Sequence, residues 1–148
     1  MKSIVDVEIN APKSDVAALM ADPANMPHWM DDLARIEPVS GNPEIPGSRF
    51  RMVGKPGSAQ ADFAVTVTAR HLPDLFALKL ESHRVDVAVT TTFTTLSAAR
   101  TKLRSEEVFS FHGLTNAVFG LLAQSRIRKH HRDHIESFRR FAESRLTG

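Results

Sequence analysis

The sequence contains no cysteine and no tyrosine among its 148 residues. Without cysteine the chain forms no disulfide and offers no thiolate as a metal ligand or nucleophile. Without tyrosine, no phenol is available as a general acid or as an oxyanion donor. The chain also has no apolar run that approaches the roughly 20 residues a membrane-spanning helix needs. We therefore expect no stable insertion into a membrane.

Targeting and phosphate-binding motifs are also missing. Asp6 and Glu8 interrupt the N-terminal segment before it becomes the apolar stretch of a secretory signal, so we predict a cytoplasmic protein. No glycine-rich phosphate loop, nucleophile elbow or zinc signature is present, and we predict no cofactor. A net charge of +2 is too small to indicate nucleic acid as a partner. Without a linker or a repeat, residues 1–148 are expected to form one domain.

Alternation of apolar and polar residues predicts β-strands over most of the first 111 residues. A strand at 3–9 is followed by Pro12, which suits the start of a short helix over 12–21. A second, shorter helical turn is expected at 24–30. Short turns then join the remaining strands into an antiparallel meander with one apolar face. These strands are predicted at 33–39, 49–53, 60–70, 76–81, 85–96 and 101–111.

The C-terminal segment has helical rather than alternating periodicity. Residues 115–146 contain no proline and one glycine, Gly120. They predict one amphipathic helix of about 45 Å, long enough to cover the concave face of the sheet. Its apolar face is formed by Ile127, His131, Ile135, Phe138 and Ala142. The fold class is therefore α+β.

Four motifs occur along the chain in a recognisable order. They are Val5-x-Val7-x-Ile9-x-Ala11-Pro12 with Val16, Asp22-Pro23-x-Asn25-x-Pro27-x-Trp29, Ile36-Glu37-x-Val39, and Pro46-Gly47-Ser48-x-Phe50. Together they resemble the SRPBCC superfamily of START lipid-transfer domains, birch-pollen-type allergens and polyketide cyclase/dehydrase-like proteins. The resemblance implies a helix-grip fold, in which a curved antiparallel sheet wraps around a long C-terminal helix, with two short helices after the first strand.

The resemblance also implies a cavity between sheet and helix, where the inward side chains would contact a ligand. Periodicity alone does not separate a lined cavity from a filled core, because interiors are densely packed. In the family, the segment around Trp29 borders the cavity entrance; a packing anchor is the alternative. The predicted ligand-binding residues are Trp29, Phe50, Met52, Phe63, Val65, Phe76, Leu78, Val87, Val89, Phe93, Ser105, Phe109, Ile127 and Phe138.

Two titratable residues share the inward phase and are the candidate catalytic residues. Glu107 lies between Ser105 and Phe109 on the apolar face of its strand, where burial raises the pKa of a carboxyl group. His131 lies on the apolar face of the helix. The two residues are candidates for proton transfer. The alternative for Glu107 is a position at the cavity mouth or a structural pair with an arginine. The alternative for His131 is a hydrogen-bonded histidine in the core.

His130 and His134 stand four residues apart, a spacing that places two imidazoles on one side of a helix. However, His130 lies towards the charged side of that helix. The sequence shows neither a nearby cysteine nor an obvious acidic third ligand. We therefore predict no metal site.

These features leave three functional hypotheses. The first is a carrier or sensor that holds a small hydrophobic ligand, lipid-like or polyketide-like, in the internal cavity. The second is a polyketide cyclase or dehydratase that uses Glu107 and His131 for proton transfer. The third is a protein-interaction module whose core is filled. The sequence does not specify the oligomeric state.

Overall fold

Apolar and polar side chains alternate so regularly along β1 (Lys2–Ile9) that every second one is buried. Similar half-buried patterns recur in the other strands and direct one face of the sheet towards the core. The structure, a computed structural model, describes residues 1–147. The other strands are β2 (Leu33–Ser40), β3 (Arg49–Gly54), β4 (Phe63–His71), β5 (Leu75–Glu81), β6 (Val85–Ser97) and β7 (Arg100–Phe111).

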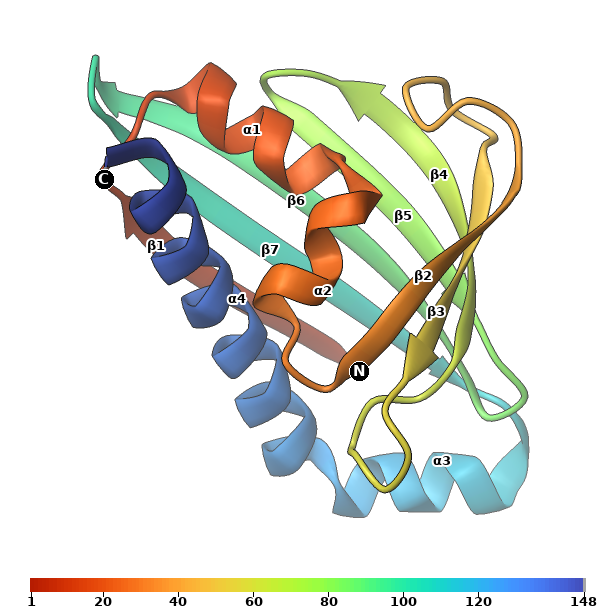
Figure 1. Cartoon of the computed structure of the whole chain (residues 1–148). Coiled ribbons are helices and arrows are strands. Elements are labelled where there is room, and N and C mark those ends of the chain that lie inside the picture. The colour runs from red at the N-terminus through yellow and green to blue at the C-terminus, as the bar shows by residue number, and fades with distance from the viewer. Residues whose placement is uncertain (148) are drawn as a thin grey trace.

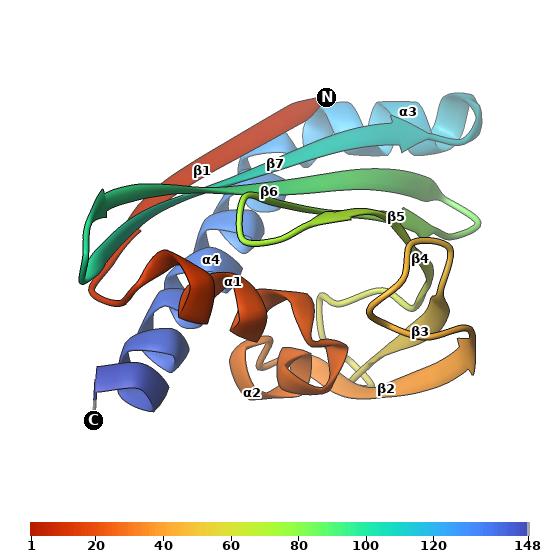
Figure 2. The same ribbon diagram turned by 90° about the horizontal axis from the view of Figure 1, so that it is seen from above.

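The seven strands form one antiparallel sheet in the order β1-β7-β6-β5-β4-β3-β2. Strands β2 to β7 follow one another as the predicted meander, and β1 joins the far side by pairing with β7. Edge strand β2 contains Pro38, at a position where a proline is tolerated because edge strands have one unpaired side. The sheet is curved, and its concave side faces the helices (Figures 1 and 2).

The concave side is covered by helices from both ends of the chain. Helix α1 (Lys13–Ala21), the 3-10 turn η1 (Pro23–Asn25) and α2 (Met26–Trp29) follow β1, which confirms the two short helices. Helix α4 (Gln124–Thr147) crosses the concave side diagonally beside them (Figure 1). It buries His131, Ile135, Phe138 and Ala142, four residues of its predicted apolar face.

The prediction of one uninterrupted helix over 115–146 is wrong. The segment forms α3 (Gly113–Leu122) and α4, which meet at Ala123, where the backbone leaves the helical region with φ −99° and ψ 6°. Because of this break, α4 is about 36 Å long at 1.5 Å per residue, while α3 lies across one end of the sheet (Figure 1). At Gly120, a Cβ would come within 2.5 Å of the Phe111 ring, so this close approach requires glycine.

The strand predicted over 60–70 begins later, at Phe63. The segment before it is a loop that the side chain of Asp62 closes by accepting a hydrogen bond from the Gly54 N–H at 2.8 Å. Gly54 also lies against the backbone of Gln60, and a Cβ there would come 2.1 Å from the Gln60 carbonyl oxygen. This β3–β4 loop therefore packs tightly at the end of the sheet near α3.

Candidate functional site

A cavity of about 400 Å³, here called the outer cavity, lies between the sheet, the β3–β4 loop and the junction of α3 with α4. Ligand sites in proteins typically measure about 300–1,000 Å³. Phe119 and Arg126 lie in its wall and are exposed, so the cavity opens to solvent there. The wall is formed by Met30, Met52, Ala59, Gln60, Ala61, Phe63, Leu80, Val85, Val87, Glu107, Phe109, Phe111, Phe119, Ala123, Arg126, Ile127, His130 and His134.

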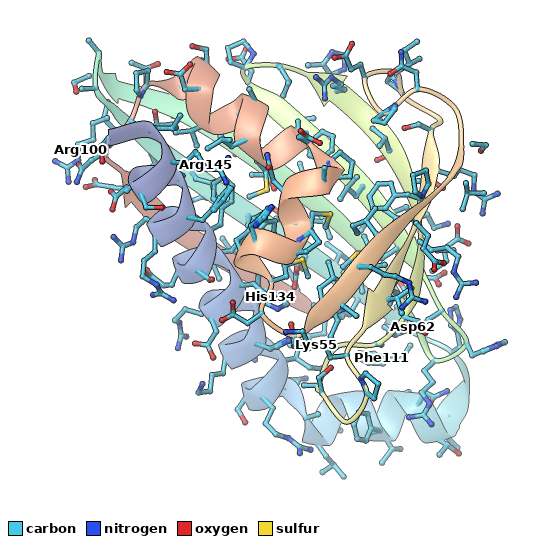
Figure 3. All side chains as sticks on the ribbon, in the orientation of Figure 1. Lys55, Asp62, Arg100, Phe111, His134 and Arg145 are labelled. Carbon is cyan, nitrogen blue, oxygen red and sulfur yellow. The ribbon has the colours of Figure 1, made fainter. Side chains whose placement is uncertain are left out.

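A smaller cavity of about 70 Å³, the inner cavity, lies deeper under α2 and α4. It shares wall residues with the outer cavity, so the two are neighbours. Figure 3 shows His134 on α4 and Phe111 at the end of the sheet, two residues of the outer wall. The inner wall is formed by Met20, Met26, Trp29, Met30, Met52, Phe76, Leu78, Leu80, Val89, Thr91, Ser105, Glu107, His131, His134 and Ile135.

Glu107 lies in the walls of both cavities. The register of β7 places it opposite Ser3 of β1 and Val89 of β6, so its side chain projects from an interior strand of the sheet into the cavities. Burial raises the pKa of Glu107 from 4.5 to about 7, because an ionised carboxylate is poorly solvated there. Near neutral pH this group therefore exists in both protonation states.

His131 is held by two serines from adjacent strands. Its Nδ1 lies 2.8 Å from Ser3 Oγ and its Nε2 lies 2.9 Å from Ser105 Oγ. Burial, helped by the charges of His134 and His130, lowers the pKa of His131 to about 4, so the ring is neutral at pH 7. Because both ring nitrogens have partners, the arrangement fits the alternative in which His131 is hydrogen-bonded in the core. Glu107 is then the titratable group that remains available to a ligand.

A second polar group borders the outer cavity, where Asp32 meets α4. The Nε2 atoms of His130 and His134 lie 2.8 Å and 3.0 Å from its two carboxylate oxygens. Burial acts to raise the pKa of Asp32, but the hydrogen bonds from the two histidines outweigh it and lower the pKa below its ordinary value. Burial and His130 lower the pKa of His134, although Asp32 opposes them. The acidic partner missing from the sequence pattern is therefore Asp32.

Most of the predicted ligand-binding residues lie in a cavity wall, as the inward phase of their strands and helix predicts. These are Trp29, Met52, Phe63, Phe76, Leu78, Val87, Val89, Ser105, Phe109 and Ile127, together with the candidate catalytic residues Glu107 and His131. Four others line neither cavity and are buried in the packed core. These are Phe50, Val65, Phe93 and Phe138.

Sequence reasoning missed part of the site. Leu80 and Met30 lie in both walls. Leu80 continues the alternation of Phe76 and Leu78, so that pattern was sufficient to find it. No sequence pattern indicates that α3 and the β3–β4 loop also supply wall residues, because this depends on how the two segments fold over the end of the sheet.

Trp29 lies in the wall of the inner cavity and carries a buried hydrogen-bond donor. Its ring packs edge-on against Phe138 and His134, with centroid distances of 5.3 Å and 6.4 Å. The indole Nε1 is buried, and no hydrogen-bond partner is present for it within residues 1–147. Buried donors are nearly always paired, so the unpaired Nε1 of this wall residue is available to a ligand atom or a water that comes within reach of it.

Helix α3 is apolar but only Gly120 in it is buried. Leu114, Phe119, Leu121 and Leu122 are 57–82% exposed. Across residues 1–147 no helix has the length and apolar character needed to cross a membrane.

Comparison with known proteins gives a family and a set of similar structures. The family model described as "Polyketide cyclase / dehydrase and lipid transport" matches residues 2–143. No curated protein sequence matches this chain significantly.

The structure is similar to solved structures of diverse proteins. The Zhui aromatase/cyclase from Streptomyces sp. R1128 superposes with a TM-score of 0.82 at 15% identity, covering 98% of this chain and 94% of that one. A START superfamily protein from Mycobacterium smegmatis superposes with a TM-score of 0.73 at 13% sequence identity, covering 99% of this chain and 97% of that one. For norcoclaurine synthase from Thalictrum flavum the TM-score is 0.72 at 11% sequence identity, and the match covers 97% of this chain and 88% of that one. At such identities the likeness concerns the fold alone, and it confirms the helix-grip arrangement.

Proposed function

This chain belongs to the polyketide cyclase/dehydrase and lipid transport family, and on that premise we propose that it holds a small hydrophobic molecule in its outer and inner cavities as a carrier or sensor. The observation that carries the proposal is an apolar cavity of about 400 Å³ whose wall contains Glu107. A cavity of this size also argues against the hypothesis of an interaction module with a filled core.

The wall chemistry specifies the kind of ligand. Phe63, Leu80, Val87 and Phe109 offer apolar surface, whose burial against a ligand contributes about 25 cal/mol per Å². Glu107, with its pKa near 7, presents a carboxyl group that donates a hydrogen bond when protonated. A lipid-like or polyketide-like molecule with one carbonyl or hydroxyl group on an apolar body fits both features.

An enzymatic role is the second candidate, and one observation favours it. A carboxyl group with a pKa of about 7 exchanges protons efficiently near neutral pH. In that role Glu107 acts without His131 as its direct partner, because the imidazole nitrogens are bonded to serines. The carrier is ranked first because the two cavities contain a single free carboxyl group and the established neighbours of the fold differ in activity.

The proposal is tested by filling the outer cavity. Val87→Trp adds a large side chain at a buried wall position of β6, and Val108→Trp is the matched control on the solvent face of β7. Native mass spectrometry of the purified wild-type protein identifies any bound apolar molecule. After its removal, the neutral dye N-phenyl-1-naphthylamine is titrated into each protein.

We expect Val87→Trp to weaken dye binding by at least about tenfold, which corresponds to about 1.4 kcal/mol. Val108→Trp is expected to bind like the wild type, and the thermal transitions establish that both variants are folded. If the stripped wild type binds no dye, or if both variants bind it unchanged, the cavity is not the binding site.

A further inference from the structure

A carboxylate and two imidazoles converge at the edge of the outer cavity. One nitrogen or oxygen atom from each of Asp32, His130 and His134 lies within 4.8 Å of the others. Four residues separate His130 from His134 on α4, so their rings share one side of the helix, with centroids 4.1 Å apart. We propose that these three residues bind one divalent first-row transition ion, beyond the hydrophobic ligand proposed above.

The distances suit a common ion. Zinc binds histidine nitrogen at about 2.0–2.1 Å and carboxylate oxygen at about 2.0–2.2 Å, which places tetrahedral ligand atoms about 3.3 Å from one another. The Nε2 atoms of His130 and His134 are already 2.8 Å and 3.0 Å from the oxygens of Asp32. Raising these two separations to about 3.3 Å requires the side chains to move apart by a few tenths of an ångström. Each neutral imidazole then carries its proton on Nδ1, which frees the Nε2 lone pair.

Two of the three residues, Asp32 and His134, are held in place by structure outside the cluster. The Asp32 carbonyl accepts hydrogen bonds from the Lys55 N–H at 2.8 Å and from Ser58 Oγ at 3.3 Å, so the β3–β4 loop fixes the residue. The Trp29 ring lies edge-on to His134 and limits its rotation. Figure 3 shows Lys55 and His134 on the same side of the molecule, near this loop. Such support is typical of ligands whose orientation matters.

The ligand types indicate which ions fit. Imidazole nitrogen suits zinc, iron, cobalt and nickel, whereas magnesium and calcium prefer oxygen ligands alone. Three protein ligands leave a coordination position open. Since His130 and His134 both line the outer cavity, a molecule there can reach that position through an oxygen atom. The ion would then act as a Lewis acid towards the polar group of the bound molecule.

The test uses zinc itself and a matched pair of variants. Tag-free protein is stripped with a chelator, dialysed and titrated with ZnCl₂ by isothermal calorimetry. Asp32→Asn removes the carboxylate, and His130→Gln removes a partly exposed ligand. Asp86→Asn is the control, because Asp86 also faces a histidine, His112, at 3.0 Å but has only one.

We expect one zinc per chain with a Kd below about 10 µM for the wild type and for Asp86→Asn. Asp32→Asn and His130→Gln should weaken binding at least about 100-fold, since changes even outside the ligand set cost 10- to 100-fold. Zinc should raise the Tm of the wild type but not that of Asp32→Asn. Failure of the stripped wild type to bind zinc, or equal binding by Asp32→Asn, overturns the proposal. A zinc-soaked crystal with the ion only on surface histidines also overturns it, whereas dye binding tests the proposed function separately.

Discussion

Glu107 and His131 lie side by side without bonding to each other: Oε1 of the carboxyl group is 3.6 Å from Nδ1 of the imidazole. The imidazole nitrogens are instead paired with the hydroxyl groups of Ser3 and Ser105. Burial shifts the two pKa values in opposite directions, to about 7 for Glu107 and about 4 for His131. Between about pH 4 and pH 7 both groups are predominantly neutral, so this part of the cavity wall carries no net charge from either residue.

The raised pKa of Glu107 predicts how stability depends on pH. Between pH 4.5 and about 7 the folded protein keeps a proton that the unfolded chain has lost, so stability decreases as pH rises through this window. The shift corresponds to at most about 3 kcal/mol. Glu107→Gln has no carboxyl group to titrate. The free energy of unfolding of this variant, relative to that of the wild type, should therefore rise by up to that amount between pH 4.5 and 7.5. Urea unfolding at several pH values measures the difference; a constant difference contradicts the prediction.

His131 is predicted to stabilise the contact between β1, β7 and α4. His131→Ala leaves a void and two buried hydroxyl groups without their partner, which should cost about 2–4 kcal/mol in the free energy of unfolding. In a double-mutant cycle with Ser105→Ala, the coupling should be about 1 kcal/mol. The exposed His83→Ala serves as the control and should change stability by less than about 0.5 kcal/mol. Coupling near zero would mean that the hydrogen bond contributes nothing.

The unpaired Nε1 of Trp29 predicts a preference among ligands. Trp29→Phe keeps an aromatic ring against Phe138 but removes the donor. We expect the variant to bind a long-chain methyl ketone about 2- to 10-fold more weakly than the wild type does, as one hydrogen bond allows. Binding of the alkane of equal length should be unchanged. Displacement of N-phenyl-1-naphthylamine measures both; equal losses for ketone and alkane would assign Trp29 a packing role alone.

Helix α3 is predicted to open more readily than α4. Its single buried residue is Gly120, whereas α4 buries His131, Ile135, Phe138 and Ala142. Backbone amides of α3 should therefore show at least about 100-fold less protection in hydrogen exchange. Gly120→Ala should reduce the protection of α3 further because its Cβ collides with the Phe111 ring, although alanine favours helices by about 1 kcal/mol. Similar protection of both helices would exclude a separately opening α3.

The sheet could be predicted from sequence because one of its faces is buried. A shift of one residue would turn every apolar side chain to solvent, so the alternation fixes which residues face inward. The same alternation revealed Glu107 as the charged residue within an inward set. The break at Ala123 could not be predicted, because alanine is the best helix former and the change of direction depends on packing against the end of the sheet.

The polar cluster at Asp32 shows where local pattern fails for the site. Asp32 lies 98 residues before His130, in the turn between α2 and β2. No periodicity joins two segments so far apart, and only the folded chain brings the carboxylate to the histidines. Local pattern also does not separate cavity-wall residues from residues of the packed core. Phe50 and Val65 have the same inward phase as residues that line a cavity, yet they are buried in the core.

The proposed ligand cavity beside Glu107 is tested most directly by the pKa of this residue, measured by NMR of its side-chain carboxyl carbon with and without the bound dye. We expect a pKa near 7 in the free protein and a higher value in the complex, because an apolar ligand removes water from around the carboxyl group. A pKa near 4.5 that the dye leaves unchanged would show that Glu107 faces bulk water and not a ligand cavity.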